Sequence, residues 1–463
     1  MKKFLTILSV VALAIAAVSC EKGGKAPKTY PVKVQLTLFG SPFAEEGIPV
    51  SLSSGSASYS VETDAEGIVS FDVPVGIYTA TTSFKKDDED ENIKRVYNGS
   101  VSITVTDQGA EMPKTISVDD PEIDPEDDGD ISKPIPLPLE ASQTSNLIIK
   151  ELYNGGCWNE SENKQYITDK YIIIYNNSAK EMDASKMCIA MAQISNTVGN
   201  AANDYNAGDG NQSYFAEGWT PASYAVWWFQ EGTSVKIAPY SQIVVSICGA
   251  VDHSVTIPNS VDLSGADYVM YDKEAGFNAA AWYPAPSSTI PSSHYMKTSV
   301  FGMGTSWAIP MQNAAPFIFE PKSKIQDFVL DEGNFVNKAS NKSGNFCKIP
   351  TDWVLDAVDI WKDDNNTTSF HRFSPAINTG HVVFAVNKNG STIYRNVDKE
   401  ATEAIEGNAS KLVYNYAGAF SEEDTDPSGI DAEASIANGA KIVYMDTNNS
   451  ANDFHVRKVA SIK

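Results

Sequence analysis

One segment of the chain carries oxygen-bearing side chains at alternate positions, residues 204–211 with the sequence DYNAGDGN. Calcium is bound by carboxylate and amide oxygens, and glycines let a ligand loop bend around the ion. The spacing therefore makes Asp204, Asn206 and Asp209 candidate calcium ligands. The segment lacks the distal glutamate of an EF-hand loop, and Asn-Asp-Gly turns also occur in ordinary solvated loops. An empty polar loop is the alternative.

A second group of candidate site residues is aromatic: Trp227-Trp228-Phe229 and Trp282-Tyr283. Flat rings in or near loops form platforms on which sugars or aromatic ligands stack. In a strand, Trp227 and Phe229 share one face and Trp228 lies on the other. The alternative is that these rings fill the core of a β-sandwich.

Catalytic motifs with fixed spacing are absent from the sequence. The five histidines are scattered, and there is no HxH or HExxH pair, no GxSxG nucleophile turn and no phosphate-binding P-loop. A glycosidase acid pair is set by spatial separation, which sequence hides. We therefore predict a protein that is not an enzyme, with no cofactor beyond possible calcium. A hydrolase whose site is assembled from distant loops is the last-ranked alternative.

The net charge is −24, which would repel phosphate backbones, so nucleic acid is not an expected partner.

The first residues have the layout of a secretory signal. Lys2 and Lys3 precede the apolar run 4–18, which is too short to be a convincing membrane span, and Ser19-Cys20 follow. The small residue before a cysteine resembles a lipobox, although Ala17 stands where leucine is usual. The resemblance implies a signal peptide at 1–19, a diacylglycerol-modified Cys20 that anchors the chain to a membrane, and a tether at 20–29. An ordinary signal peptide with a chance cysteine is the alternative.

Four further cysteines follow, Cys157, Cys188, Cys248 and Cys347, and none forms a CxxC pair. An exported compartment permits disulfides, and four thiols allow three pairings. Buried free thiols are the alternative.

Residues 30–118 are predicted to form a small β-sandwich. Val32, Val34, Leu36 and Leu38 alternate with polar residues, and short strands recur between Gly and Asp turns. The run from Gly47-Ile48-Pro49-Val50 through Thr63-Asp64 and Gly67 to Gly76-x-Tyr78-x-Ala80 resembles the carboxypeptidase-regulatory-like (prealbumin-like) module. That resemblance implies a seven-stranded sandwich that serves as a spacer or adhesive unit without catalytic residues.

Residues 119–146 are predicted to be an interdomain linker. Eight of the twelve residues at 119–130 are acidic, and prolines then alternate with Ile and Leu at 134–139. Charge repulsion and proline both favour an extended chain.

The remainder, 147–463, holds all eight tryptophans and is predicted to be a larger β-rich domain. Strands are expected at 147–154, 170–178, 189–192 and 239–246. Their order, including the run KYIIIYNNS at 170–178, resembles a lamin-tail-like immunoglobulin sandwich, with an insertion at about 195–225.

Later blocks of this region, at 349–358 and 446–454, resemble an uncharacterised Bacteroidetes lipoprotein family of unknown function. Members of that family are commonly associated with TonB-dependent outer-membrane transport, which makes such a transporter a possible partner. The run Glu21 to Lys25 is not the acidic run associated with surface export, so the face of the outer membrane stays open.

The sequence thus predicts a mainly β chain: a prealbumin-like or immunoglobulin-like sandwich, then a larger lamin-tail-like sandwich with insertions. Its expected task is that of a lipid-anchored envelope accessory that binds a ligand. The alternative is a glycan-binding surface lipoprotein that uses the tryptophan clusters.

Overall fold

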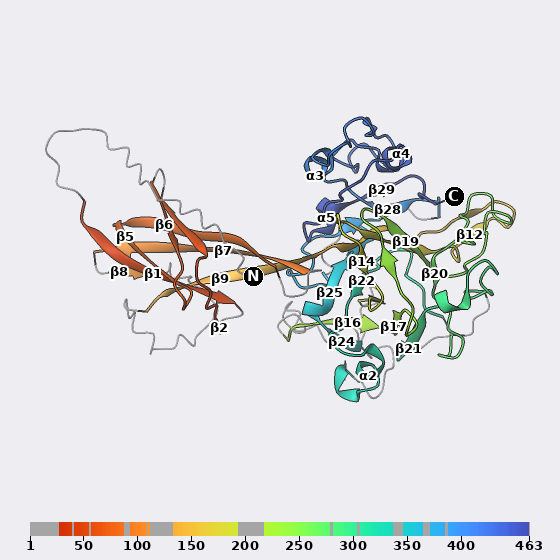
Figure 1. The fold of residues 1–463 in the computed structure, drawn as a ribbon, viewed down its shortest axis with the longest axis horizontal. Coiled ribbons are helices and arrows are strands. Elements are labelled where there is room, and N and C mark those ends of the chain that lie inside the picture. The colour runs from red at the N-terminus through yellow and green to blue at the C-terminus, as the bar shows by residue number, and fades with distance from the viewer. Residues whose placement is uncertain are drawn as a thin grey trace, which may run out of the picture. The chain divides into compact units, whose positions relative to one another are not determined.

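The computed structural model describes residues 27–38, 41–54, 57–87, 93–107, 109–111, 133–192, 217–277, 281–302, 306–336, 346–363, 371–384 and 388–462. Cys20 and the calcium candidates Asp204, Asn206 and Asp209 lie outside these ranges. Most regular structure is strand and the helices are short, which confirms the predicted mainly β, sandwich-like fold class. The chain divides into two compact units, Met1–Asp87 with Arg95–Ser142, and Asp88–Lys94 with Gln143–Lys463 (Figure 1).

The regular elements in the described part of the first unit are all strands, which form a sandwich. Its strands are β1 (Thr29–Leu38), β2 (Ser41–Pro42), β3 (Pro49–Ser54), β4 (Ala57–Glu62), β5 (Ile68–Pro74), β6 (Gly76–Asp87), β7 (Ile93–Thr106), β8 (Gly109–Glu111) and β9 (Ile135–Ser145). Their order is β2-β1-β9-β7-β6-β3-β4, with β5 on β1 and β8 on β7. The alternation predicted for β1 is present, because Val32, Val34 and Leu36 are fully buried in this unit's core.

A tight turn before β5 depends on two residues. The Asp64 carboxylate accepts the backbone N–H groups of Glu66 and Ile68 at 3.2 and 2.8 Å. Gly67 has φ +76°, and a Cβ there would lie 2.0 Å from the carbonyl oxygen of Phe43. Only glycine fits this position.

Strand β9 corrects the prediction of a linker through residue 146. Ile135, Leu137 and Leu139 are buried, while Pro136 and Pro138 are exposed between them. The strand pairs in parallel with β1, in the register Val34↔Ile135. The alternation of proline with Ile and Leu that predicts an extended linker is also the two-residue period of a half-buried strand. Burial of each branched side chain is worth about 2 kcal/mol, which outweighs proline's poor fit to a sheet.

The second unit is built on two sheets that face each other. The six-stranded sheet has the order β20-β19-β13-β10-β28-β29 and the five-stranded sheet β21-β17-β15-β22-β25. The first comprises β10 (Leu147–Tyr153), β13 (Tyr171–Asn176), β19 (Gln242–Ser246), β20 (Tyr268–Val269), β28 (Thr392–Arg395) and β29 (Phe454–Arg457). The second comprises β15 (Cys188–Met191), β17 (Ala225–Trp228), β21 (Lys297–Val300), β22 (Pro316–Phe319) and β25 (Val354–Ala357). The four strands predicted from the sequence are β10, β13, β15 and β19.

The main core lies between these two sheets. Ile149 of β10 and Ile172 of β13 meet Ile189 of β15 and Trp227 of β17 there. Every residue of β10 and β13 is buried, because other segments cover the outer face of the sheet. The sequences of these two strands are therefore largely continuous apolar runs and do not alternate between apolar and polar residues.

The outer faces are covered by smaller elements. A three-stranded sheet, β16 (Trp219–Ser223), β24 (Phe346–Pro350) and β23 (Phe335–Val336), packs with α2 (Ile325–Phe328) on the five-stranded sheet. Helix α4 (Ala432–Ala437) packs on the six-stranded sheet, close to α3 (Lys399–Glu403) (Figure 1). The remaining elements are β11 (Cys157–Asn159), β12 (Lys164–Tyr166), β14 (Met182–Asp183), β18 (Lys236–Ile237), β26 (Ile360–Trp361), β27 (Val382–Val383), α5 (Ser450–Asp453) and the 3-10 turns Ser292–His294, Glu332–Asn334 and Thr351–Trp353.

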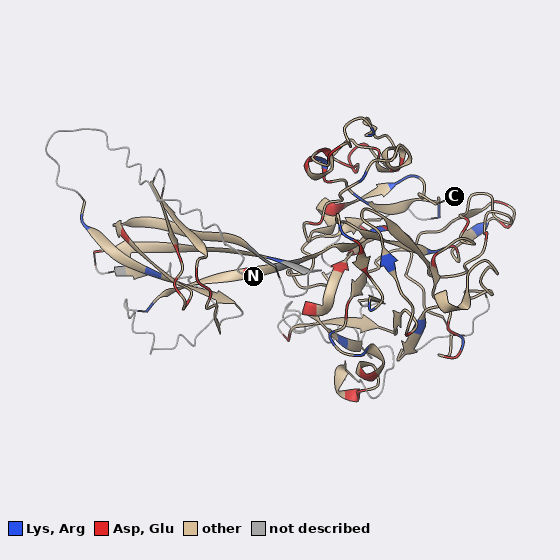
Figure 2. Ribbon diagram, viewed as in Figure 1, with Lys and Arg blue, Asp and Glu red and all other residues tan. Residues whose placement is uncertain are grey.

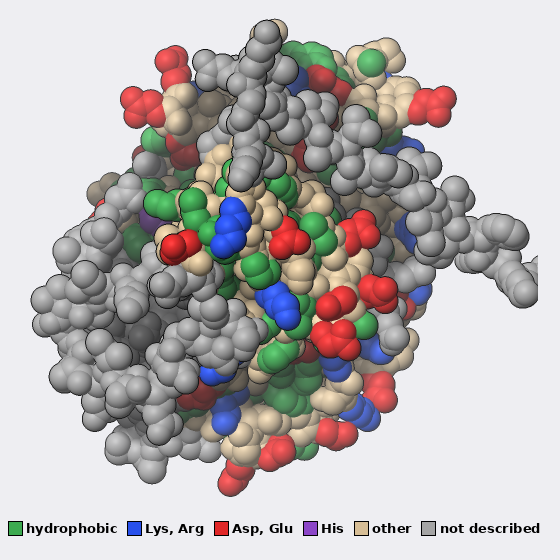
Figure 3. Space-filling model, turned by 90° about the vertical axis from the view of Figure 1, so that its left-hand side faces the viewer, with side chains coloured by type: hydrophobic (Ala, Val, Ile, Leu, Met, Phe, Trp, Pro, Cys, Tyr) green, Lys and Arg blue, Asp and Glu red, His purple; other side chains and the backbone are tan. Residues whose placement is uncertain are grey.

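Acidic residues are spread over both units and mark the short helices of the second, whereas Lys and Arg are fewer (Figure 2). On the face shown in Figure 3, charged side chains of both signs are interspersed with hydrophobic ones. Among the described residues, no helix has the length and apolarity needed to cross a membrane.

Candidate functional site

Most of the predicted aromatic candidates lie in the main core. Trp227 is fully buried and stacks on Phe277, with ring centroids 5.7 Å apart. Tyr283 is 2% exposed, and its hydroxyl donates to the Trp307 carbonyl at 2.7 Å. Phe229 and the partly buried Trp282 pack against the same core. The structure thus brings these four residues together as packing, with little ring surface left for a ligand.

Trp228 lies on the opposite face of β17, as the strand alternation predicted. With Phe229 it lines a cavity of about 540 Å³, which we call the Trp228 pocket. One wall consists of residues 185–186 and 228–233, and the other of residues 321–326. A pocket of this size accommodates a small organic molecule.

The walls of the Trp228 pocket are held by hydrogen bonds and by packing. The Gln230 side-chain amide donates to the carbonyl oxygens of Ser292 and Tyr295, both at 2.7 Å. The chain then reverses at Gly232, where φ is +83°. Across the pocket, Ile325 of α2 is buried in the core beneath the three-stranded sheet. The two walls are therefore held by different parts of the unit: one by hydrogen bonds to the backbone of Ser292 and Tyr295, the other by packing of Ile325 in the core.

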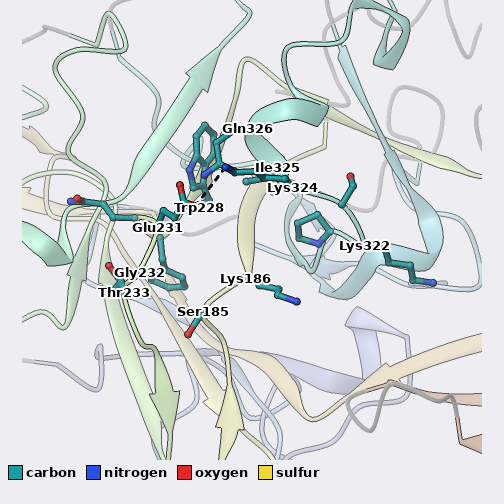
Figure 4. A pocket seen from close by; sticks show the side chains of 14 residues that line it. Ser185, Lys186, Trp228, Glu231, Gly232, Thr233, Lys322, Lys324, Ile325 and Gln326 are labelled. Carbon is teal, nitrogen blue, oxygen red and sulfur yellow. Dashed lines mark ion pairs between the residues drawn. The ribbon is translucent and has the colours of Figure 1, made fainter.

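Three lysines are among the residues that line the Trp228 pocket (Figure 4). Lys324 pairs with Glu231, which lies in the pocket wall, at 3.5 Å, and Lys322 pairs with Asp352 at 2.7 Å. Lys186 is exposed, and no ion pair of its side chain is found within the described residues. Because Glu231 and Asp352 offset two of the three ammonium groups, the three lysines leave an excess of one positive charge at the pocket. This excess suits an anionic ligand.

Sequence reasoning identified Trp228 and Phe229 but missed Lys186, Lys322 and Lys324. Single lysines near turns are unremarkable in sequence, and these come from segments 136 positions apart, by the difference between 186 and 322. Only the packing of α2 beside β17 brings them to one cavity.

The four described cysteines are free and fully buried. Of the alternatives left open by the sequence, the structure has buried thiols rather than disulfides. Burial raises the pKa of the Cys157, Cys248 and Cys347 thiols to about 12. These groups stay protonated near neutral pH and are poor nucleophiles. In the part of the chain that the structure describes, no group of three or more His, Cys, Asp or Glu residues could hold a metal ion.

Residues 238–461 match the model of a family described as a protein of unknown function, DUF4876. A crystal structure of a DUF4876 family protein from Bacteroides thetaiotaomicron VPI-5482 is similar over 93% of this chain and 95% of that one, with 20% identity and a TM-score of 0.49. No curated protein matches the chain. The descriptions of the two matches mention no catalytic activity.

Proposed function

We propose that this chain is a lipid-anchored accessory protein of the cell envelope, and that its second unit binds a small, negatively charged ligand in the Trp228 pocket. The observation that carries the proposal is the pocket itself: a cavity of about 540 Å³ with aromatic rings and three lysines among the residues that line it. Ligand sites typically combine apolar lining with a few placed charges.

The charges decide which ligand suits the pocket better. Trp228 is only 9% exposed and Phe229 3%, so ring stacking can supply little of the binding energy. Lys322 and Lys324 have roughly half-exposed side chains, and Lys186 adds a third ammonium group. Lys322 and Lys324 are paired with Asp352 and Glu231, so we propose that attraction of a carboxylate, sulfate or phosphate by Lys186 is the larger contribution.

The cell-envelope part of the proposal is supported by the N-terminal segment. A positively charged start, a short apolar run and Ser19-Cys20 together indicate export and lipidation. We propose that the anchor lies in the outer membrane and that the first unit is a spacer of the carboxypeptidase-regulatory-like kind. The resemblance to lipoproteins associated with TonB-dependent transport supports a role in presenting a ligand to such a transporter. The lack of a spaced catalytic motif supports a binding role rather than catalysis.

A second candidate function is recognition of a neutral glycan. The observation that favours it is that two of the predicted aromatic residues, Trp228 and Phe229, do line a cavity. In this case contact with the rings and hydrogen bonds, rather than charge, would dominate the affinity.

Calorimetric titration with three probes separates the two functions: benzenetricarboxylate, the acidic trisaccharide trigalacturonate, and the neutral trisaccharide maltotriose. We expect the two anions to bind and maltotriose not to. The double substitution Lys186→Gln with Lys322→Gln should weaken anion binding by about tenfold or more, because each charge-assisted contact contributes about 1.5–3 kcal/mol. Lys164→Gln, at a lysine that is 63% exposed outside the pocket, is the matched control.

Two results would overturn this assignment. If neither anion binds, the proposal that the Trp228 pocket takes an anionic ligand is wrong. Binding of maltotriose that is lost in Trp228→Phe but unaffected by the lysine changes would establish the glycan function instead. Conservative replacement by Phe keeps the buried ring position filled, so that a loss of binding does not simply report misfolding.

A further inference from the structure

A second cavity of about 670 Å³ lies in the same unit and shares no lining residue with the Trp228 pocket. It is formed by the turn after β10, the loop 254–261, the turn 388–390 and the segment after β29. We call it the Ser260 cavity. The proposed function makes no use of it.

The base of the Ser260 cavity is a polar cluster around one buried carboxyl group. The Ser260 hydroxyl donates to Asp169 Oδ2 at 2.7 Å, and the Tyr153 hydroxyl donates to the same oxygen at 3.1 Å. Cys157 Sγ is 3.7 Å from it. Ser260, Tyr153 and Cys157 all line the cavity, so Asp169 lies directly behind its surface.

The other oxygen of this carboxyl group is unpaired. Asp169 is fully buried, and its Oδ1 has no hydrogen-bond partner within the described structure. A buried polar atom without a partner costs about 1–3 kcal/mol. Asp169 itself does not line the cavity, so a ligand reaches this carboxyl group through the Ser260 and Tyr153 hydroxyls. Burial also raises the pKa of Asp169, which favours the protonated carboxyl, a group that can donate as well as accept.

One side wall of the Ser260 cavity is apolar. Val261 and Ala460 are 3% and 6% exposed and pack with Tyr153 in a small cluster on the outer face of the six-stranded sheet. Ile462 is partly buried against the same cluster. Because Val261 and Ala460 have little accessible surface, the apolar contact that this wall offers a ligand comes from Ile462 and from Val459, which is 44% exposed.

The charged side chains that line the Ser260 cavity are two lysines and one carboxylate, that of Glu160. Lys388 and Lys458 are both exposed, and within the described residues no ion pair of either is found. The turn that carries Lys388 is fixed by hydrogen bonds from its N–H to the Gly155 carbonyl and from Gly390 N–H to the Gly156 carbonyl, both 3.1 Å. Lys388 itself has φ +71°, a conformation that costs energy for a residue with a side chain.

We infer that the Ser260 cavity is a second binding site, for an organic anion with an apolar body and a polar far end. The anionic group pairs with Lys388 and Lys458, the apolar body rests on Val459 and Ile462, and the polar end reaches the Ser260 hydroxyl, in front of Asp169. The inference is independent of the proposed function, because the two cavities have no residue in common.

Three related probes test this arrangement: para-hydroxyphenylacetate, which has the anion, the ring and a hydroxyl; phenylacetate, which lacks the hydroxyl; and tyramine, in which an ammonium replaces the carboxylate. Ligand-observed NMR titration of the full chain measures each affinity. We expect para-hydroxyphenylacetate to bind about tenfold more tightly than phenylacetate, because only its hydroxyl can form a hydrogen bond with the Ser260 hydroxyl. Tyramine should not bind.

Variants then locate the site. Lys388→Gln with Lys458→Gln should weaken binding of para-hydroxyphenylacetate by about tenfold or more. Lys186→Gln with Lys322→Gln, which removes the same charge from the Trp228 pocket, should have the smaller effect. Ser260→Ala should remove the preference for the hydroxylated probe while phenylacetate still binds. Three results would overturn the inference. Para-hydroxyphenylacetate does not bind, or tyramine binds equally well, or binding is weakened only by the changes at Lys186 and Lys322. The exposed lysine changes do not threaten folding, so loss of binding in them is interpretable.

Discussion

The ammonium group of Lys150 lies 2.7 Å from the carboxylate of Glu433, 283 positions later in the chain. Lys150 is fully buried in β10 and also donates to the Gln242 side chain at 2.7 Å. The rings of Tyr175, Tyr394 and Tyr444 surround the ammonium at 5.4–5.9 Å. This contact joins the centre of the six-stranded sheet to helix α4.

Lys150→Met should destabilise the second unit by about 3 kcal/mol, because breaking a buried ion pair leaves the partner charge uncompensated. Lys150→Met with Glu433→Gln should recover part of this loss, since no unpaired charge remains. Urea unfolding followed by tryptophan fluorescence measures both, because all eight tryptophans lie beyond residue 147. A double variant no more stable than the single one would contradict an uncompensated charge as the cause.

Stability of the second unit should fall as the pH drops below about 6.5, partly through His455. Its Nδ1 lies 2.7 Å from Asn396 Oδ1 and its Nε2 lies 2.9 Å from the Tyr416 hydroxyl, partners that suit a neutral ring. Burial, and then the charge of Arg457, lower the pKa of His455 from 6.5 to about 3. Between these values the unfolded chain binds a proton that the folded chain does not, so stability rises with pH in that window.

At pH 5.5 the contribution of His455 should be a loss of about 1.4 kcal/mol relative to neutral pH. His455→Gln lacks the titrating ring, so the difference between its stability and that of the natural chain should shrink as the pH falls from 7 to 5.5. Urea unfolding at a series of pH values measures this difference. A constant difference across the series would show that His455 takes up a proton as readily in the folded chain as in the unfolded chain.

Gly67→Ala should strongly destabilise the first unit. The added Cβ would lie 2.0 Å from the Phe43 carbonyl oxygen, and the backbone has positive φ. Gly47→Ala is the matched control, because Gly47 has φ +83° and open space around it. The control should lose only about 1 kcal/mol from backbone strain, and Gly67→Ala clearly more. Calorimetric melting measures the stability of the first unit in both variants. Equal losses of stability in the two variants would show that the turn at Gly67 moves to make room for the added Cβ.

The four described thiols should not react with N-ethylmaleimide in the folded protein. They are fully buried, and burial holds the pKa of the Cys188 thiol well above its usual range, as it does for the other three. In guanidinium without reductant all four should be alkylated, as counted by mass spectrometry of digested protein. Labelling of only two would instead indicate a disulfide.

Cys20→Ser should move the protein from membrane to soluble fractions and abolish incorporation of a labelled fatty acid. The reason is that a diacylglycerol thioether can form only on a cysteine thiol. Ser19→Ala, which keeps a small residue before the cysteine, is the control and should stay anchored. A natural chain that takes up no label would contradict the anchor.

Part of this architecture is determined by the sequence itself. The alternation at Val32, Val34 and Leu36 and the continuous apolar run of β13 identify strands, because pleating and burial act on neighbouring residues. The same local rule predicted that Trp227 and Trp228 face opposite sides of one strand. The turn at Asp64 and Gly67 is likewise readable, since its chemistry is confined to a few residues.

Only the tertiary structure decides what covers each face and where space remains. The alternating prolines of β9 fit both a linker and a strand, and pairing with Val34, about a hundred positions away, selects the strand. The lysines of the Trp228 pocket, and the approach of Lys388 and Lys458 to Ser260, come from segments with no shared local pattern. Such sites depend on contacts between distant segments, whose energies are set by packing and are not encoded in the spacing of neighbouring residues.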